Sequence, residues 1–292
     1  MTTRKRNNTQ RRGASSKAAR MKVANVKRMF MAFLWLAIVV GLLYYIGRFM
    51  FNDMTAKGAE PAVDNSPLLD VRLMPGMEVE QCDYVGYRVY FNSKYHIPNC
   101  VVYELLRSET QGETPRYKNF EPDPNFEESA TPADYTHSGY DRGHMAPAAD
   151  MKWSSQAMHE SFYMSNICPQ DKSLNTGGWN KLENKVREWA ERDSVLIVAC
   201  GPIITDDMPT IGNNRVAVPP AFFKAVLAPC ANPPRAIGFI YKNQTCKGEV
   251  KKYAVSIDAI EASTGYDLFG ALPDDVEAAV EATYNYKDWG LR

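Results

Sequence analysis

The sequence is poor in the residues that build small metal-stapled or redox domains. It holds four histidines and no Cys-x-x-Cys pair in 292 residues, which argues against a structural zinc site or a thioredoxin-like motif. Glycine and proline number only 18 each, which excludes collagen-like and low-complexity chains. Acidic residues are absent from residues 1–28, although the whole chain balances 34 basic against 34 acidic residues. The zero net charge therefore conceals two unlike parts.

Charge divides the chain into a basic tail and an acidic body. Residues 1–28 carry ten basic residues, which leaves 24 basic and 34 acidic residues in 29–292, a net charge of −10. An acidic body argues against a protein that coats nucleic acid through charge alone, but it leaves room for a local basic cleft. The composition, 45% hydrophobic and 23% charged, is typical of globular proteins.

An uncharged stretch follows the basic tail. Residues 29–46 read MFMAFLWLAIVVGLLYYI, close to the roughly 20 apolar residues that span a bilayer. All ten basic residues of the tail precede it, so the pattern predicts an anchor in the lipid bilayer at 29–47, with a cytoplasmic N-terminus and an extracytoplasmic (periplasmic or extracellular) body. Two alternatives stay open: a signal peptide cleaved near 56–59, which would release a secreted body, and a mitochondrial targeting segment.

The rest of the chain predicts a linker and one α+β domain. We expect a basic cytoplasmic tail at 1–28, the transmembrane anchor at 29–47, a proline- and glycine-containing linker at 48–78 and a domain at 79–292. Strands without strict alternation with helices favour a mixed or antiparallel sheet over a doubly wound one.

Hydrophobic periodicity places the expected elements along the domain. The expected strands are two within 83–106, joined by a turn near Pro98, and single ones at 194–204, 223–228 and 235–243. The expected helices are 153–160, 176–192 and 273–282, whereas 255–264 is undecided and 109–140 is loop.

All six cysteines follow the apolar stretch. An even number in an exported body predicts disulfides, although six cysteines allow 15 pairings. Cys230 and Cys246 flank an expected hairpin and are the favoured pair. Cys200 lies in an apolar run and fits a buried free thiol equally well.

One stretch of the sequence collects candidate catalytic residues. Arg142 lies two residues before His144, so both share a face of an extended segment. Asn175 stands where the helix at 176–192 is expected to begin, and helix N-termini favour asparagine and bind anions. Glu183 and Arg187 are one helical turn apart. Each residue alone also fits a structural role, as a helix cap, a surface ion pair or an ordinary surface residue.

Together these residues carry a resemblance. The order DRGHMAP, SNICPQ and LNTGGWNKLE resembles the DNA/RNA non-specific endonucleases of the ββα-metal (His-Me finger) superfamily, which includes secreted bacterial nucleases and mitochondrial endonuclease G. The family signature is DRGH, an asparagine about thirty residues later and then a helical glutamate. Here the intervals are 31 and eight residues, and further similar segments extend the resemblance over about 80–285. It adds a ββα-metal motif to the predicted α+β fold.

The resemblance implies a role for each of the three signature residues. His144 would be the general base that activates a water, a task suited to an imidazole with a pKa near 6.5. Asn175 would be the direct protein ligand of one Mg²⁺ ion, for which Mn²⁺ could substitute; Mg²⁺ commonly keeps several waters. Glu183 would hydrogen-bond the metal-bound waters.

The resemblance also implies a substrate and a reaction. Arg142 and Arg187 would lie near the scissile phosphate, and Arg116 matches a family arginine in the preceding loop. The implied activity is metal-dependent hydrolysis of DNA and RNA to products with 5′-phosphates, without sequence preference, since backbone contacts carry little sequence information. Many family members form homodimers. Two other hypotheses are a membrane-anchored nucleic-acid-binding module without turnover, and a zinc or thiol enzyme that uses the cysteines.

Overall fold

The computed structural model describes Trp35, residues 65–77 and residues 79–291. The chain divides into two units, Met1–Val63 and Asp64–Arg292, and Trp35 alone represents the first among the described residues. The predicted basic tail and the predicted anchor, apart from Trp35, therefore lie outside the described residues.

The predicted fold class needs one correction. The α+β part fits, but no helix in the described part of the chain is long and apolar enough to cross a membrane. The transmembrane helix that we predicted at 29–47 is therefore not supported, and neither is a contact with lipid through it.

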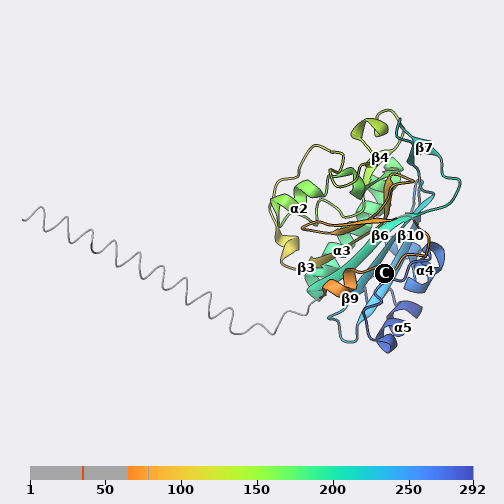
Figure 1. Ribbon diagram of the computed structural model, residues 1–292. Helices are drawn as coiled ribbons and strands as arrows, with labels where there is room; N and C mark the ends of the chain where they lie inside the picture. The colour runs from red at the N-terminus through yellow and green to blue at the C-terminus, as the bar shows by residue number, and fades with distance from the viewer. Residues whose placement is uncertain (1–34, 36–64, 78, 292) are drawn as a thin grey trace, which may run out of the picture. The chain divides into compact units, whose positions relative to one another are not determined.

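A seven-stranded sheet forms the centre of the second unit (Figure 1). Every neighbouring pair of its strands is antiparallel. In spatial order the strands are β1 (Glu80–Asp83), β2 (Arg88–Asn92), β3 (Ile97–Leu106), β6 (Val195–Ile203), β9 (Ala221–Ala228), β10 (Arg235–Lys242) and β11 (Ala254–Val255). Strands β6 and β9 are buried on both faces, which explains their continuous apolar sequences.

The turn between β2 and β3 lies close to Pro98, as predicted, but it ends before the proline. It lies at residues 93–96, and Pro98 is a residue of β3, opposite Phe91. The pairing register shifts between Tyr90 and Phe91. Proline has no backbone N–H to donate, so within a sheet it is tolerated at such an irregularity.

One face of the sheet carries the elements that hold the candidate site. These are β4 (Asp141–His144), α2 (Ser155–Glu160), β5 (Ile167–Gln170), the π-helical turn η5 (Leu174–Trp179) and α3 (Asn180–Asp193). Helix α3 buries Leu182, Val186 and Trp189, a stripe with helical spacing. These side chains pack in one core with Val101, Tyr103 and Leu105 of β3 and with other residues of this layer.

The opposite face carries α4 (Ile257–Thr264) and α5 (Asp274–Ala282). The undecided segment 255–264 is thus mainly helical. Ser256 caps α4 by accepting a hydrogen bond from the amide of Ala259, and Gly265 ends the helix with φ of 72°. Ile257, Ile260 and Val280 pack in a second core with the sheet residues that alternate with the first set, and Leu68 and Val71 of the segment before β1 join it.

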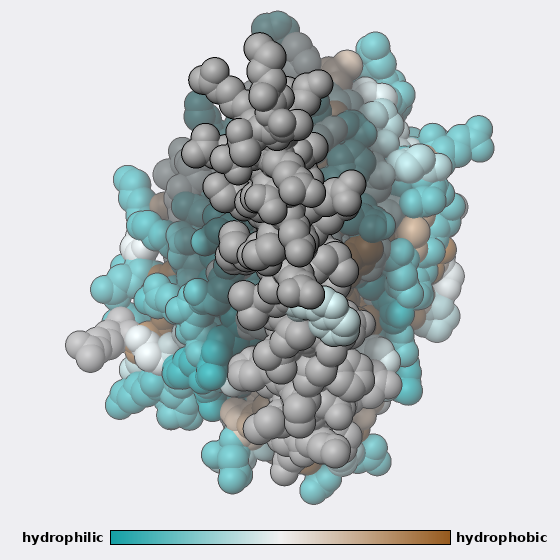
Figure 2. Space-filling view, turned by 90° about the vertical axis from the view of Figure 1, so that its left-hand side faces the viewer, coloured by the Kyte–Doolittle hydropathy of each residue, from teal (hydrophilic) through white to brown (hydrophobic). Residues whose placement is uncertain are grey.

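Short elements complete the described chain. They are the 3₁₀ turns η1 (Ser66–Leu69), η2 (Glu109–Gln111), η3 (Pro132–Tyr135), η4 (Met164–Asn166) and η6 (Val250–Tyr253), and the hairpin of β7 (Thr210–Ile211) and β8 (Val216–Ala217). The segment 109–140, predicted as loop, contains η2 and η3. The surface drawn in colour in Figure 2 is mostly hydrophilic, with small hydrophobic patches.

The six cysteines are free in the structure. The predicted disulfide between Cys230 and Cys246 is therefore not formed. Cys200 is buried, as its apolar run indicated, and its thiol donates to the carbonyl oxygen of Met145 at 3.1 Å.

Candidate functional site

Two short antiparallel strands and the following helix build the core of the site. In the antiparallel pair of β4 and β5, His144 pairs with Ile167, and η5 and α3 follow β5 along the chain. Gly143 is required by the close packing of these two strands: a Cβ atom there would lie 2.4 Å from Oε1 of Gln170. The glycine of the DRGH sequence thus allows the strand that presents His144 to approach its partner.

A cavity of about 290 Å³ lies at this β-β-α unit. All six candidate residues from the sequence line it, namely Arg116, Arg142, His144, Asn175, Glu183 and Arg187, together with Pro147, Ala148, Ala149, Thr176 and Asn180. Three arginines face a single carboxylate there. The acidic body therefore contains the local basic cleft that its net charge left open.

His144 is enclosed by aromatic rings. Its ring centroid lies 5.3 Å from that of Phe120 and 5.0 Å from that of Phe162, and its side chain is only 9% exposed. Trp179 donates from Nε1 to the backbone oxygen of His144 at 3.3 Å. The imidazole Nε2 is buried and has no hydrogen-bond partner. Such an atom is available to a substrate or a water.

Burial makes the imidazole of His144 a weaker base than the sequence suggested. Desolvation, and then the positive charge of Arg116, lower the pKa of His144 from 6.5 to about 3. The imidazole is therefore neutral, and able to accept a proton, at every pH from about 4 upward.

Asn175 belongs to the π-helical turn η5. The helical residues begin at Lys172 rather than after Asn175, so Asn175 lies inside the helix and the predicted capping position is wrong. Its amide nitrogen Nδ2 donates to Oδ2 of Asp141 at 3.1 Å. Asp141 thereby orients the amide and leaves Oδ1, a hard oxygen, available to a cation at the cavity. π-Helical turns of this kind are frequent at functional sites.

The second glycine of Thr176-Gly177-Gly178 permits this turn to pack against the body. A Cβ atom on Gly178 would lie 2.1 Å from Sγ of Cys246 and 3.0 Å from the ring of Tyr241. A larger residue would push away the segment that carries Asn175.

Glu183 lies on α3, two turns after Asn175, and lines the same cavity. Desolvation raises the pKa of this carboxyl group to about 7, while the charges of Lys224 and then Arg187 oppose the rise. The pKa of Glu183 thus lies near neutral pH, where a small change in the surrounding charge alters the ionisation of the carboxyl group.

Two arginines are held over aromatic rings. The guanidinium of Arg116 lies 5.0 Å from the ring centroid of Phe162, and that of Arg142 lies 5.3 Å from the centroid of Phe120. Arg142 also donates to the backbone oxygen of Pro132 at 2.7 Å. The two rings that enclose His144 therefore also fix the two arginines beside it.

Arg187 is fixed by a buried carboxylate instead. It donates from Nη1 to Oδ1 of Asp150 at 2.6 Å, and Tyr103 donates to Oδ2 of Asp150 at 2.9 Å. Asp150 is fully buried, and its two oxygens are satisfied by these two partners. The other terminal nitrogen, Nη2, donates to Oδ1 of Asn184 at 2.7 Å.

The roles of Asp150 and Lys224 were not predicted from the sequence. Asp150 stands six residues after His144, where no spacing rule pairs it with Arg187. Lys224 lies in β9 with no exposed surface, 4.8 Å above the ring of Trp179, and it contributes to none of the described ion pairs. A lysine inside an apolar strand was the signal available in the sequence, because lysine is rarely fully buried in a folded protein.

The donor set fits a hard divalent cation. The cavity offers the amide oxygen of Asn175 and the carboxylate of Glu183, without a sulfur or imidazole cluster that would favour zinc. Neutral and anionic oxygens with room for water match an ion of the Mg²⁺ class.

Comparison with known proteins agrees with this geometry. Residues 68–275 match the family described as DNA/RNA non-specific endonuclease. A β-β-α unit that presents a histidine, an asparagine and a glutamate to one cavity defines a nuclease of the ββα-metal class, and the chain belongs to the DNA/RNA non-specific endonuclease family. Members of this family generally depend on a divalent metal ion.

The similar proteins include nucleases of vertebrates, yeasts and a bacterium. The chain is 34% identical over 223 residues to the mitochondrial nuclease EXOG of Xenopus laevis, which covers 69% of this chain and 61% of the relative. It is 32% identical over 211 residues to a nuclease of Serratia marcescens, covering 68% of this chain and 77% of the relative. Its fold matches a solved structure of an EndoG/EndoGI complex with a TM-score of 0.65 and 26% identity, over 74% of this chain and 94% of that chain. The match spans only about three fifths of the length of the EXOG relatives.

Proposed function

We propose that this chain is a divalent-metal-dependent endonuclease that hydrolyses the phosphodiester bonds of DNA and RNA without sequence preference. The observation that carries the proposal is the single cavity in which His144, Asn175, Glu183 and three arginines meet. A protein that only binds nucleic acid needs arginines, but it needs neither a buried neutral imidazole nor an oriented amide oxygen.

The residues divide the reaction between them. His144 accepts a proton from water as the water oxygen bonds to phosphorus. The bond from phosphorus to O3′ breaks, which leaves a 5′-phosphate and, after a proton from solvent, a 3′-hydroxyl. An anionic phosphate beside Arg116 offsets the charge that lowers the pKa of His144, so substrate binding makes the imidazole a stronger base.

The metal site and the arginines complete the proposal. Asn175 would hold the ion directly, and Glu183 would accept hydrogen bonds from its waters. A bound Mg²⁺ ion supplies positive charge that stabilises the leaving oxygen. Arg142, Arg187 and Arg116 hold the phosphate oxygens, and Asp150 keeps Arg187 in place.

Cleavage assays test the proposal directly. The full-length protein is incubated with supercoiled plasmid and with RNA, in Mg²⁺ and in EDTA. We expect cleavage of both substrates in Mg²⁺ and none in EDTA. A folded protein that binds both substrates but leaves them intact in Mg²⁺ and in Mn²⁺ would instead be a binding module. The homodimer stays a prediction, which the mass of the protein in solution tests.

The raised pKa of Glu183 predicts how the metal requirement depends on pH. The carboxyl group takes up a proton as pH falls through about 7, and a protonated carboxyl group holds metal-bound waters poorly. We therefore expect the half-saturating Mg²⁺ concentration for cleavage to be constant above pH 8 and to rise by about tenfold between pH 8 and pH 6. The variant Glu183→Gln should need more Mg²⁺ at pH 8 and show no such rise. A wild-type requirement that is flat from pH 8 to pH 6 would contradict the assignment.

Lys224 is expected to act through Glu183. Its buried charge lowers the pKa of Glu183, so Lys224→Met should raise that pKa and increase the half-saturating Mg²⁺ concentration at pH 7 by about tenfold. The fold should survive, because methionine fills a similar volume and Glu183 can take up a proton once the lysine charge is gone. Lys242→Met, at the exposed end of β10, is the matched control. An unchanged metal requirement in a folded Lys224→Met protein would remove this role.

A further inference from the structure

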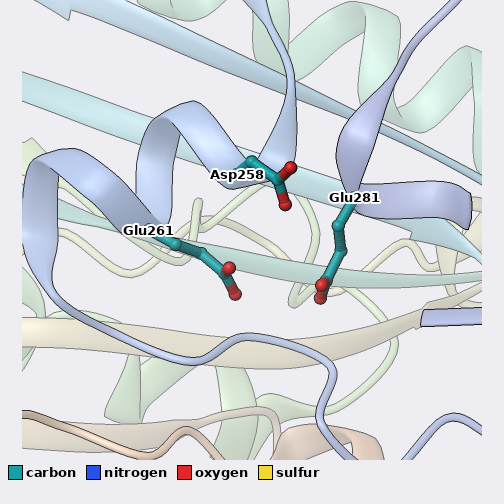
Figure 3. A group of neighbouring side chains, drawn as sticks. All are labelled: Asp258, Glu261 and Glu281. Atoms are coloured by element: carbon teal, nitrogen blue, oxygen red, sulfur yellow. The ribbon is translucent and has the colours of Figure 1, made fainter. Parts of the chain in front are cut away.

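Three carboxylates meet on the sheet face opposite the cavity. Asp258 and Glu261 come from α4, and Glu281 comes from α5. One oxygen from each lies within 4.8 Å of the others. Figure 3 shows the three side chains converging from the two helices.

The most buried of these carboxylates lacks a partner. Glu281 is only 7% exposed, and its Oε1 is buried without a hydrogen-bond partner. Figure 3 shows this side chain reaching toward the space between the helices. Burial, and then the charge of Glu261, raise the pKa of Glu281 to about 8.

Protein cations do not neutralise the group within the described residues. None of the described ion pairs includes Asp258, Glu261 or Glu281; the nearby Arg72 pairs with Asp267 at 3.2 Å. Glu261 accepts one hydrogen bond, from the amide of Leu268 at 2.7 Å. A buried carboxyl group beside two others must either keep its proton or be neutralised by a cation.

We propose that Asp258, Glu261 and Glu281 bind a divalent cation of the Ca²⁺ class. Calcium takes oxygen ligands at about 2.3–2.6 Å, so oxygens on opposite sides of the ion stand about 5 Å apart, as these three permit. Magnesium demands a tighter octahedron, which carboxylates on two separate helices suit less well. This site shares no residue with the catalytic cavity.

The cation would join α4 to α5 on one face of the sheet. Ile260 of α4 and Val280 of α5 already pack in the same core. The ion binds the folded arrangement and not the separated helices, so it stabilises the fold. Its effect is on stability rather than on catalysis.

Thermal unfolding of the full-length protein tests this site. All variants carry Asn175→Ala, which removes the contribution of the proposed catalytic metal. In EDTA, Glu281→Gln should unfold at the same temperature as its parent or higher, because glutamine keeps the size of the side chain and removes one of three adjacent acidic groups. In Ca²⁺ at about 100 times its Kd, the Tm of the parent should rise by about 5 to 10 °C, whereas that of Glu281→Gln should not move.

A charge control separates binding from simple screening. Glu277→Gln removes one negative charge from the same helix α5 but none of the three ligands, so it should keep the Ca²⁺-dependent rise. Equal rises in the parent and in Glu281→Gln would overturn the proposal, and so would the absence of a rise in the parent. Loss of the rise in Glu277→Gln as well would show diffuse screening and would also overturn it.

Discussion

Replacing His144 with alanine is expected to reduce kcat/KM for plasmid cleavage by about 10³-fold or more. General bases contribute about 10² to 10⁴ to a rate, and the structure offers no second imidazole at the cavity among the described residues. Binding of nucleic acid should change little, because the three arginines remain. The measurement compares cleavage rates and binding constants of the two proteins in the same Mg²⁺ buffer.

A second histidine provides the control for this variant. His137 lies in the segment before β4, is exposed and has φ of 57°, a conformation that asparagine tolerates well. His137→Asn should therefore cleave plasmid at the wild-type rate. If His144→Ala retained more than about a tenth of the wild-type rate, the base would have to be another group and the mechanism proposed above would be wrong.

The second large effect is expected at Asn175. In Asn175→Ala the cavity loses the amide oxygen that Asp141 orients, so the half-saturating Mg²⁺ concentration should rise by at least about 100-fold. The cleavage rate at saturating Mg²⁺ should also fall, because the remaining contacts position the bound ion less precisely. Metal titrations of the cleavage rate measure both quantities.

The control for Asn175 is an asparagine away from the cavity. Asn213 is exposed in the loop between β7 and β8, and Asn213→Ala should leave the metal requirement unchanged. An Asn175→Ala protein with the wild-type requirement would show that the ion is held by other groups. The variant Asp141→Asn keeps the ligand Asn175 but loses the charge that orients its amide. Its Mg²⁺ requirement should therefore rise less than that of Asn175→Ala.

Much of the fold followed from periodicity in the sequence. The long apolar runs predicted β6, β9 and β10, and the stripe through Val186 and Trp189 predicted α3, because these patterns reflect which faces are buried. The turn near Pro98 lies at residues 93–96, and the proline itself is a residue of β3, because tertiary pairing accommodates it at a register shift. The predicted disulfide between Cys230 and Cys246 was wrong, since flanking a hairpin does not bring two thiols together.

The candidate site was predicted only in part. His144, Asn175 and Glu183 were found because their order and spacing resemble a family signature, and the structure brings them to one cavity. Asp150 and Lys224 were not found, because their roles depend on contacts with α3 that no local pattern records. The proposed calcium site was not predicted for the same reason. Glu281 lies on α5, which a loop separates from Asp258 and Glu261 on α4.

The sequence by itself determined where most strands and helices form and which residues are candidates for catalysis and metal binding. Both depend on local order: hydrophobic spacing selects the elements, and the DRGH segment, asparagine and glutamate lie in one continuous stretch. The tertiary structure alone decided the ionisation of these groups. The pKa of His144 falls to about 3 and that of Glu183 rises to about 7, because desolvation and distant charges such as Arg116 and Lys224 act through space, and packing brings them together.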